Sequence, residues 1–174
     1  MKPPILFSGL MLSCACGTGP ASEQNAGTAI GDSVAHATID LAGHGLPLLL
    51  TAPDKELTGG ADPSIIWKDE TGTLAVGAGE HFGLEIREEP ADIPRLKATL
   101  DRDLLRRNTV VREEPDLLVW RSEFPDDPSL VFIHFYRVLK TDGREFTVQD
   151  ADGQTFNQQD IERMRTAISA KPPA

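Results

Sequence analysis

Hydrophobic and polar residues alternate along much of the chain after residue 36, which is typical of half-buried β-strands. The clearest case is the segment 81–89, where Phe82, Leu84 and Ile86 alternate with glycine and charged residues. Turn-forming residues separate such segments at short intervals. We therefore predict strands at 37–41, 46–52, 64–69, 73–77 and 81–89, with a hairpin turn at 70–72. The first two are either separate strands or one strand interrupted at 43–45.

After residue 92 the spacing of apolar residues changes to that of an amphipathic helix. The apolar residues that share one face of this helix are Ile93, Leu96, Leu100 and Leu104. Asp92 can cap the helix, and Pro94 is tolerated in its first turn. Arg106 and Arg107 suit the expected C-terminal end, where the helix dipole favours cations, and Asn108 is the expected stop.

Three further strands are expected at 117–124, 130–140 and 144–150. The middle one is apolar on both faces, which is typical of a central strand. Residues 141–143 form a short hairpin turn before the last strand.

A second helix closes the folded part. Asn157 is its expected cap, Asp160 stands at the third helical position, and Phe156 is placed to contact Ile161. The apolar stripe of this helix consists of Ile161, Met164 and Ile168. Residues 171–174 are expected to form a frayed tail.

These elements predict an α+β domain, in which an antiparallel β-sheet is covered by two main helices. Their order, with the terminal helix "TFNQQDIERMRTAIS", resembles the PsbP-like fold, an antiparallel sheet sandwiched by helices that also occurs in bacterial envelope lipoproteins. The resemblance spans residues 36–170. It rests on element order and the terminal helix, so it implies a fold and transfers no functional residue.

The first residues have the layout of a secretory signal: a basic Lys2, a short apolar run at 5–12, and then small residues. The run is shorter than the roughly 20 apolar residues of a membrane-spanning helix. Met11-Leu12-Ser13-Cys14 resembles the bacterial lipobox, in which the cysteine becomes lipidated and N-terminal. We therefore predict a signal peptide at 1–13, lipidation of Cys14, a flexible tether at 14–35, and one globular domain at 36–170.

Other interpretations of the two cysteines fit less well. Ala15-Cys16 also matches a relaxed lipobox, so Cys16 is the alternative lipidation site, and a plain cleaved signal remains a further alternative. A metal site would need three or four ligands at compatible spacing, and the first histidine is His36. A redox pair normally begins a helix, and a disulfide between cysteines two positions apart would be strained.

The net charge of the chain limits the classes of partner that we expect. The chain carries 27 acidic and 17 basic residues, a net charge of −10. Nucleic-acid binding needs a basic face that displaces counterions, so no nucleic-acid partner is expected, and direct binding to anionic lipid is equally disfavoured. A run of acidic residues after the cysteine would resemble the surface-export signals of some bacterial lipoproteins. No such run follows Cys14. We expect an anchor in the bacterial cell envelope, in the outer membrane and facing the periplasm.

Several short motifs resemble catalytic or metal sites only superficially. Gly31-Asp32-Ser33 imitates an esterase nucleophile block but follows a tether, and the last histidine, His134, lies in a predicted strand. The glycines at 77, 79 and 83 precede a strand rather than a helix, so a turn or bulge is expected instead of a dinucleotide site. Asp150, Asp152 and Gly153 begin like a calcium loop but lack its final glutamate.

The remaining candidates also have structural interpretations. The acidic pairs at 88–89, 113–114 and 126–127 are expected at solvated strand ends, with convergence of two pairs on a divalent cation as the alternative. The histidines, His36, His44, His81 and His134, lack ligand spacing. His134 is expected to be hydrogen-bonded on a sheet face, or else to sense protons or contact a ligand. The aromatic residues Trp67, Trp120, Phe132, Phe135 and Tyr136 are expected in the core or around an apolar pocket.

Two hypotheses about function follow. The first is a non-enzymatic, lipid-anchored envelope protein whose domain docks onto another envelope protein, in an assembly or stability role. The alternative is a module that binds a small apolar ligand or lipid between sheet and helix. The sequence predicts no catalytic residue, no cofactor and no metal site.

Overall fold

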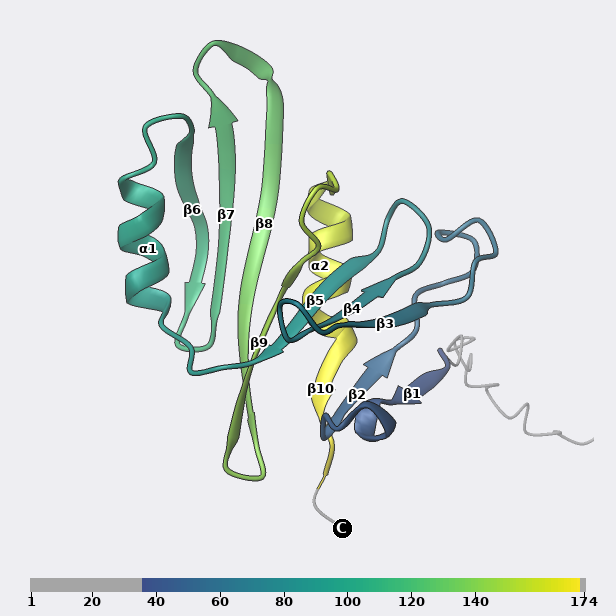
Figure 1. Ribbon diagram of the computed structural model, residues 1–174. Helices are drawn as coiled ribbons and strands as arrows, with labels where there is room; N and C mark the ends of the chain where they lie inside the picture. Colours follow the sequence, from purple (N-terminus) through teal and green to yellow (C-terminus); the bar gives the residue numbers. More distant parts are fainter. Residues whose placement is uncertain (1–35, 173–174) are drawn as a thin grey trace, which may run out of the picture. The chain divides into compact units, whose positions relative to one another are not determined.

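A seven-stranded antiparallel sheet forms the larger part of the computed structural model, which describes residues 36–172 (Figure 1). Its strand order is β3-β4-β5-β9-β8-β7-β6. The strands are β3 (Ser64–Lys68), β4 (Thr73–Gly77), β5 (Gly83–Glu88), β6 (Arg107–Glu114), β7 (Leu117–Phe124), β8 (Asp127–Thr141) and β9 (Arg144–Asp150). The expected hairpins at 70–72 and 141–143 are confirmed. Asp142 and Gly143 both have positive φ, 53° and 71°, which matches the twist of a two-residue hairpin turn.

A second antiparallel sheet has the order β1-β2-β10. It consists of β1 (Thr38–Asp40), β2 (Leu48–Thr51) and β10 (Ile168–Ala170), with a 3₁₀ helix, η1 (Leu41–His44), between the first two. The sequence predicted the first two strands but not β10, because Ile168 fits the apolar stripe of the preceding helix. Lys171 was expected in the frayed tail, but its N–H donates to the Pro47 carbonyl at 3.0 Å, so this residue is held by the domain. Residues 173–174 of the expected tail lie outside the described residues.

Two α-helices complete the fold, α1 (Ile93–Asp101) and α2 (Gln158–Ala167). Both predicted caps are confirmed: the Arg95 N–H donates to Asp92, and Asn157 and Asp160 form a reciprocal capping box. Both Phe156 and Ile161 are buried in the core next to this cap. The α+β class is therefore confirmed, and most of its regular structure is sheet.

The prediction for α1 is wrong at its C-terminal end, because the helix stops at Asp101 rather than near Asn108. The Asp103 carboxylate accepts hydrogen bonds from the N–H groups of Leu105 and Arg106, which turns the chain. Residues 107–114 then form β6, a strand that the sequence analysis missed. Asn108 still acts on the helix end, since its side-chain amide donates to the Leu100 carbonyl at 3.0 Å.

The core lies on the face of the large sheet that α2 covers. Alternate residues of the central strands point into it, so that Phe135 of β8 is fully buried together with Phe146 and Val148 of β9. Contributions from outside this sheet include Leu48, Leu50, Ile161, Met164 and Ile168. Arg137, also on this face of β8, donates to the carbonyls of Arg165 (2.6 Å) and Ile168 (2.9 Å) at the end of α2.

The other face of the large sheet lies beside α1. On the strands, the residues between the core positions point to this side. Among them are Trp120, His134 and Tyr136, which lie across from residues of α1. No side chain of α1 is buried, so the helix covers this face only loosely. The loose cover leaves a groove between helix and sheet.

Replacing Arg137 with methionine should destabilise the domain by about 1.5–3 kcal/mol, because a charged donor to the α2 carbonyls is lost. The measurement is equilibrium unfolding in urea. The control is Arg121→Met on the neighbouring strand, where a half-exposed pair with Glu123 is lost and a change below about 0.5 kcal/mol is expected. Equal effects of the two variants would contradict this role of Arg137.

Candidate functional site

The groove between α1 and the large sheet has a volume of about 520 Å³. Its floor is made by side chains of four strands, which alternation places on one face: Arg87 of β5, Gln149 of β9, His134 and Tyr136 of β8, and Trp120 of β7. Its wall is the side of α1 that carries Arg95, Leu96, Thr99 and Leu100. The groove thus joins residues that are up to 65 positions apart, such as Arg87 and Asp152.

His134 and Asp150 form the best-defined polar contact in the groove. The Nδ1 of His134 lies 2.7 Å from Oδ2 of Asp150, and the other carboxylate oxygen accepts the Phe135 N–H at 2.8 Å. Asp150 is buried, so both of its oxygens are fixed by partners inside the domain. The expectation of a hydrogen-bonded histidine on a sheet face is confirmed.

Tyr136 lies next to His134 on the same face, one pleat further along β8. Burial, and after it the negative charge of Glu89, raise the pKa of the Tyr136 phenol above its ordinary value. The phenol is therefore neutral at physiological pH and can donate or accept one hydrogen bond.

Most charged groups around the groove are tied to partners within the domain. Arg87 donates to the Thr73 hydroxyl at 2.9 Å and to the buried Glu85 carboxylate at 2.8 Å. Arg106 is paired with Asp103 at 2.8 Å. The groove lining also contains the carboxylates of Glu89, Asp92, Asp150 and Asp152. Polar and apolar groups therefore share the lining about equally, in contrast to a purely apolar pocket that the aromatic residues could have formed.

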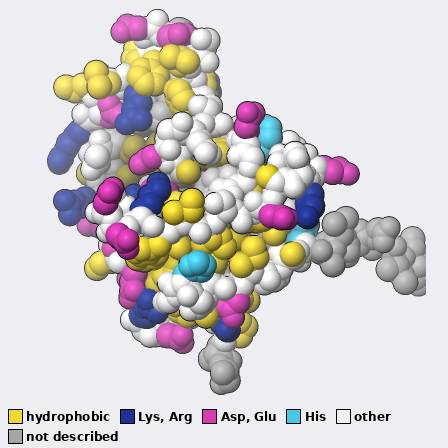
Figure 2. Space-filling model, turned by 45° about the vertical axis from the view of Figure 1, so that its right-hand side comes forward, with side chains coloured by type: hydrophobic (Ala, Val, Ile, Leu, Met, Phe, Trp, Pro, Cys, Tyr) yellow, Lys and Arg dark blue, Asp and Glu magenta, His cyan; other side chains and the backbone are white. Residues whose placement is uncertain are grey.

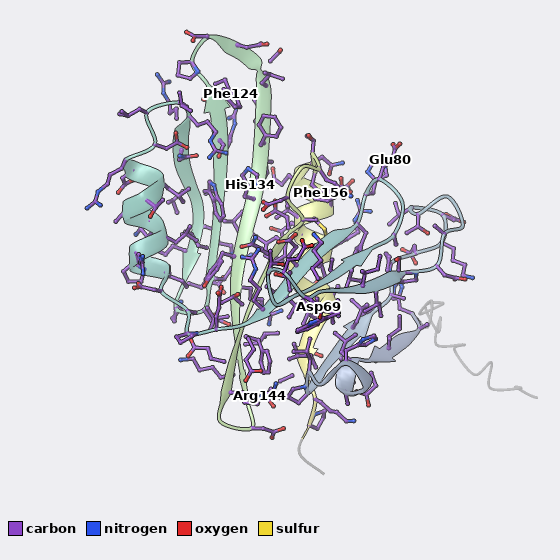
Figure 3. All side chains as sticks on the ribbon, in the orientation of Figure 1. Asp69, Glu80, Phe124, His134, Arg144 and Phe156 are labelled. Carbon is purple, nitrogen blue, oxygen red and sulfur yellow. The ribbon has the colours of Figure 1, made fainter. Side chains whose placement is uncertain are left out.

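An aromatic row leads from the groove to the end of the β7–β8 hairpin. It consists of Trp120, His134, Phe132 and Phe124, with successive ring centroids 5.2, 6.4 and 5.9 Å apart. The first two contacts are stacked and the last is edge-to-face. Figure 3 shows His134 midway along this hairpin and Phe124 close to its far end.

The row ends at a cluster of apolar residues, which we call the tip patch: the half-buried Phe124 and the exposed Leu104, Leu105 and Leu130. Leu104 and Leu105 are 96% and 77% exposed, and Leu130 is also exposed. The register brings them to one end of the sheet, because Arg107 pairs with Glu123 and Glu123 pairs with Val131. Figure 2 shows hydrophobic side chains gathered at the upper left, at the end of this hairpin.

The sequence analysis missed the tip patch because it placed Leu104 on the buried face of a helix. A usable signal was present in "DRDLLRRN", where two adjacent leucines stand between charged residues. Asp103 ends the helical spacing at this point, and the leucines then fall in a loop.

Two of the other histidines contact carboxylates elsewhere in the domain, and the third is exposed. His36 lies 3.2 Å from the Asp54 carboxylate, and His81 lies 3.2 Å from Asp160 at the cap of α2. His44 is exposed at the end of η1. The structure does not bring these three together with His134 into one site.

The aromatic residues divide between four environments. Phe135 is fully buried in the core, as one interpretation expected. Trp120 and Tyr136 line the groove, and Phe132 belongs to the aromatic row. Trp67 is 43% exposed on β3, at the edge of the large sheet.

The glycine-rich segment 77–83 forms the turn between β4 and β5, as expected. Gly83 is required by close packing, because a Cβ atom there would lie 2.6 Å from Oε1 of Gln154 and 2.9 Å from the Phe156 ring. Gly79 has a φ of +62° and lies against the backbone of Thr58. Neither position opens a helix, so the segment has no geometry for a dinucleotide.

At least one residue of each predicted acidic pair binds a cationic or polar side chain of the domain. Glu88 pairs with Arg144 at 2.5 Å, and this hydrogen bond holds its pKa below the ordinary value. Glu113 pairs with Lys97 at 2.6 Å, and Asp127 accepts from the Ser129 hydroxyl. Within residues 36–172 no group of three or more histidine, cysteine, aspartate or glutamate residues is arranged to hold a metal ion.

The lipidation candidates Cys14 and Cys16, and the Gly31-Asp32-Ser33 segment, lie outside the described residues. In the part of the chain that the structure covers, no helix is both long and apolar enough to cross a membrane.

Comparison of the chain with models of protein families, with curated proteins and with solved structures found no match.

Proposed function

We propose that this chain is a lipid-anchored protein of the bacterial cell envelope that acts without catalysis, by docking its globular domain onto another envelope protein. The observation that carries the docking proposal is the tip patch, where Leu104 and Leu105 stand almost fully in water beside Phe124 and Leu130. Burying one leucine side chain against a partner is worth about 1.5–3 kcal/mol. An exposed apolar cluster of this kind is typical of an interaction site.

The aromatic row extends this surface. Trp120 and His134 at the groove and Phe132 and Phe124 towards the tip form one line of rings along the sheet face. Aromatic side chains supply large contact area at low entropic cost and are enriched in protein interfaces. A partner segment that contacts the tip patch can continue along this row into the groove, whose lining contains both polar and apolar side chains.

The non-enzymatic part of the proposal is supported by His134. Its Nδ1 is paired with the Asp150 carboxylate at 2.7 Å, and among residues 36–172 no hydrogen bond joins the ring to a hydroxyl or thiol. Acid–base chemistry needs a nucleophile or substrate group within reach of the base. The Asp150–His134 hydrogen bond joins the side chains of β9 and β8.

The alternative function, binding of a small apolar ligand or lipid, has the groove as its site. The groove is large enough for a small molecule, but its lining includes four carboxylates and three arginines. An apolar ligand would separate these groups from water without offering them hydrogen bonds, which is costly. Docking of a polypeptide, which carries both apolar and polar groups, suits this lining better.

For the fold we propose the PsbP-like architecture that the element order resembles. Its support is that α2 and α1 lie along opposite faces of the seven-stranded sheet. The three-stranded sheet is an addition to that arrangement.

The docking proposal predicts a specific crosslink at the tip patch. With the photoreactive residue p-benzoylphenylalanine in place of Leu105, irradiation of intact cells should give an adduct of defined mass. Leu104→Asp in the same chain should lower its yield about tenfold, because one buried leucine contact is lost. The matched control carries the photoreactive residue at Val111, which is 57% exposed on β6. The proposal fails if Leu105 and Val111 give the same adducts.

The anchor proposal predicts that labelled palmitate is incorporated at Cys14. Cys14→Ala should abolish labelling, whereas Cys16→Ala should leave it intact, since the aliphatic residues at 11 and 12 precede Cys14 in the lipobox-like pattern. Labelling that persists in Cys14→Ala and is lost in Cys16→Ala moves the site to Cys16. Absence of labelling in the unmodified chain contradicts the anchor.

The groove can be probed by tryptophan emission, because Trp67 and Trp120 are the two tryptophans of the chain. In Trp67→Phe the emission reports on Trp120 at the groove. Addition of oleate should leave this emission unchanged, because the charged lining disfavours an apolar ligand. Trp120→Phe, which reports on Trp67 at the sheet edge, is the control. A saturable shift seen in Trp67→Phe alone would instead favour the ligand-binding function.

A further inference from the structure

The strand β3 is an edge of the seven-stranded sheet and carries exposed apolar side chains on both of its faces. Its residues are Ser64, Ile65, Ile66, Trp67 and Lys68, and it pairs with β4 on one side. Ile66 is 58% exposed, and Trp67, on the opposite face, is 43% exposed. In an antiparallel edge strand, alternate N–H and C=O groups point away from the sheet and are available to another strand.

The other edges of the described sheets are protected. At the opposite edge of the large sheet, β6 contains a bulge near Val111 and four charged residues, namely Arg107, Arg112, Glu113 and Glu114. The edges of the small sheet, β1 and β10, have three residues each. Bulges, charges and short length are the features that block pairing between edges. Within β3 there is no bulge and no proline.

The one charge of β3 does not protect it. The Lys68 ammonium lies 2.9 Å from Oε1 of Glu85, a buried residue two strands further into the sheet. The side chain is therefore drawn inward over its own sheet and its charge is matched there. A strand that approaches the open edge meets Ile65, Ile66 and Trp67 rather than an ammonium group.

We propose that β3 pairs antiparallel with β3 of a second copy of this chain, about a two-fold axis through Ile66. In this register Ile66 faces Ile66 of the partner. Ile65 of each chain faces Trp67 of the other chain. At each of the three central positions an apolar side chain then faces an apolar side chain, and this holds on both faces of the sheet. Both strands use the same surface, as a two-fold interface requires.

Neighbouring two-fold registers match less well. An axis through Ile65 places Trp67 opposite Pro63, which cannot donate a backbone hydrogen bond, and places Ile66 opposite Ser64. An axis through Trp67 places Ile66 opposite Lys68 and Ile65 opposite Asp69. The strand is therefore complementary to itself in one register, and this self-complementarity favours a second copy as its partner.

The pairing involves five residues on each chain, so it is much smaller than the roughly 1,200–2,000 Å² interface of a stable complex. We expect a weak dimer that exchanges rapidly. It uses a surface separate from the tip patch, because β3 and β6 are opposite edges of the sheet.

Disulfide trapping tests the register directly. In the full chain with Cys14→Ser and Cys16→Ser, which removes both native thiols, Ile66→Cys places one thiol on the proposed axis. The two Cα atoms would lie about 4.5–5.5 Å apart, within the range of a disulfide. Mild oxidation should give at least about five times more covalent dimer than Val111→Cys, whose exposure on the opposite edge is nearly the same. Ser64→Cys, displaced from the axis, should behave like Val111→Cys.

Sedimentation across a wide concentration range tests the association without a thiol. The unmodified chain should show a monomer–dimer equilibrium, and Ile66→Asp should raise its dissociation constant about tenfold or more, because two carboxylates would face each other. Since Ile66 is exposed, this variant should keep the unfolding midpoint of the unmodified chain. Equal trapping at Ile66 and Val111, a monomer at every concentration, or unchanged association in Ile66→Asp would each overturn the proposal.

Discussion

The architecture depends on the alternation of side chains along β8, the strand of fifteen residues that pairs with β7 on one side and β9 on the other. Because successive residues of a strand point to opposite faces, Phe135 enters the core while His134 and Tyr136 enter the groove. Arg137, again on the core side, holds the end of α2 through two carbonyls. A shift of one residue in the pairing of β8 would exchange these two sets and destroy both the core and the groove.

Asp150 fixes this arrangement where the pairing of β8 and β9 ends. One of its oxygens accepts the Phe135 N–H, taking the place of a backbone partner, and the other binds His134. The same carboxylate thus connects the main chain at a core position to a side chain in the groove. His134 in turn stacks on Trp120. The buried Asp150 carboxylate thus positions the His134 ring within the aromatic row.

The sequence predicted correctly those elements whose ends are set by contacts between neighbouring residues in the chain. Caps such as Asn157 with Asp160 lie within one turn of chain, and the predicted helix starts are confirmed. The end of α1 was wrong because the leucine spacing continues to Leu104, whereas the Asp103 side chain turns the backbone. The groove could not be derived, since it joins Arg87, His134 and α1 through strand order, which no single stretch of sequence encodes. The tip patch was not predicted, because the expected helix extended too far and included Leu104.

Net charge affects the two exposed apolar surfaces differently. A chain with a net charge of −10 repels a second copy of itself, so pairing through β3 must overcome this repulsion, and salt that screens it should strengthen the dimer. Charged residues flank the tip patch in the sequence: Arg106 and Arg107 follow its leucines, and Asp126 and Asp127 come shortly after Phe124. A different protein can match such a mixed pattern with charges of its own, whereas a second copy can only repeat it. The edge that is nearly free of charge is therefore suited to self-pairing, and the end that is rich in charge is suited to a distinct partner.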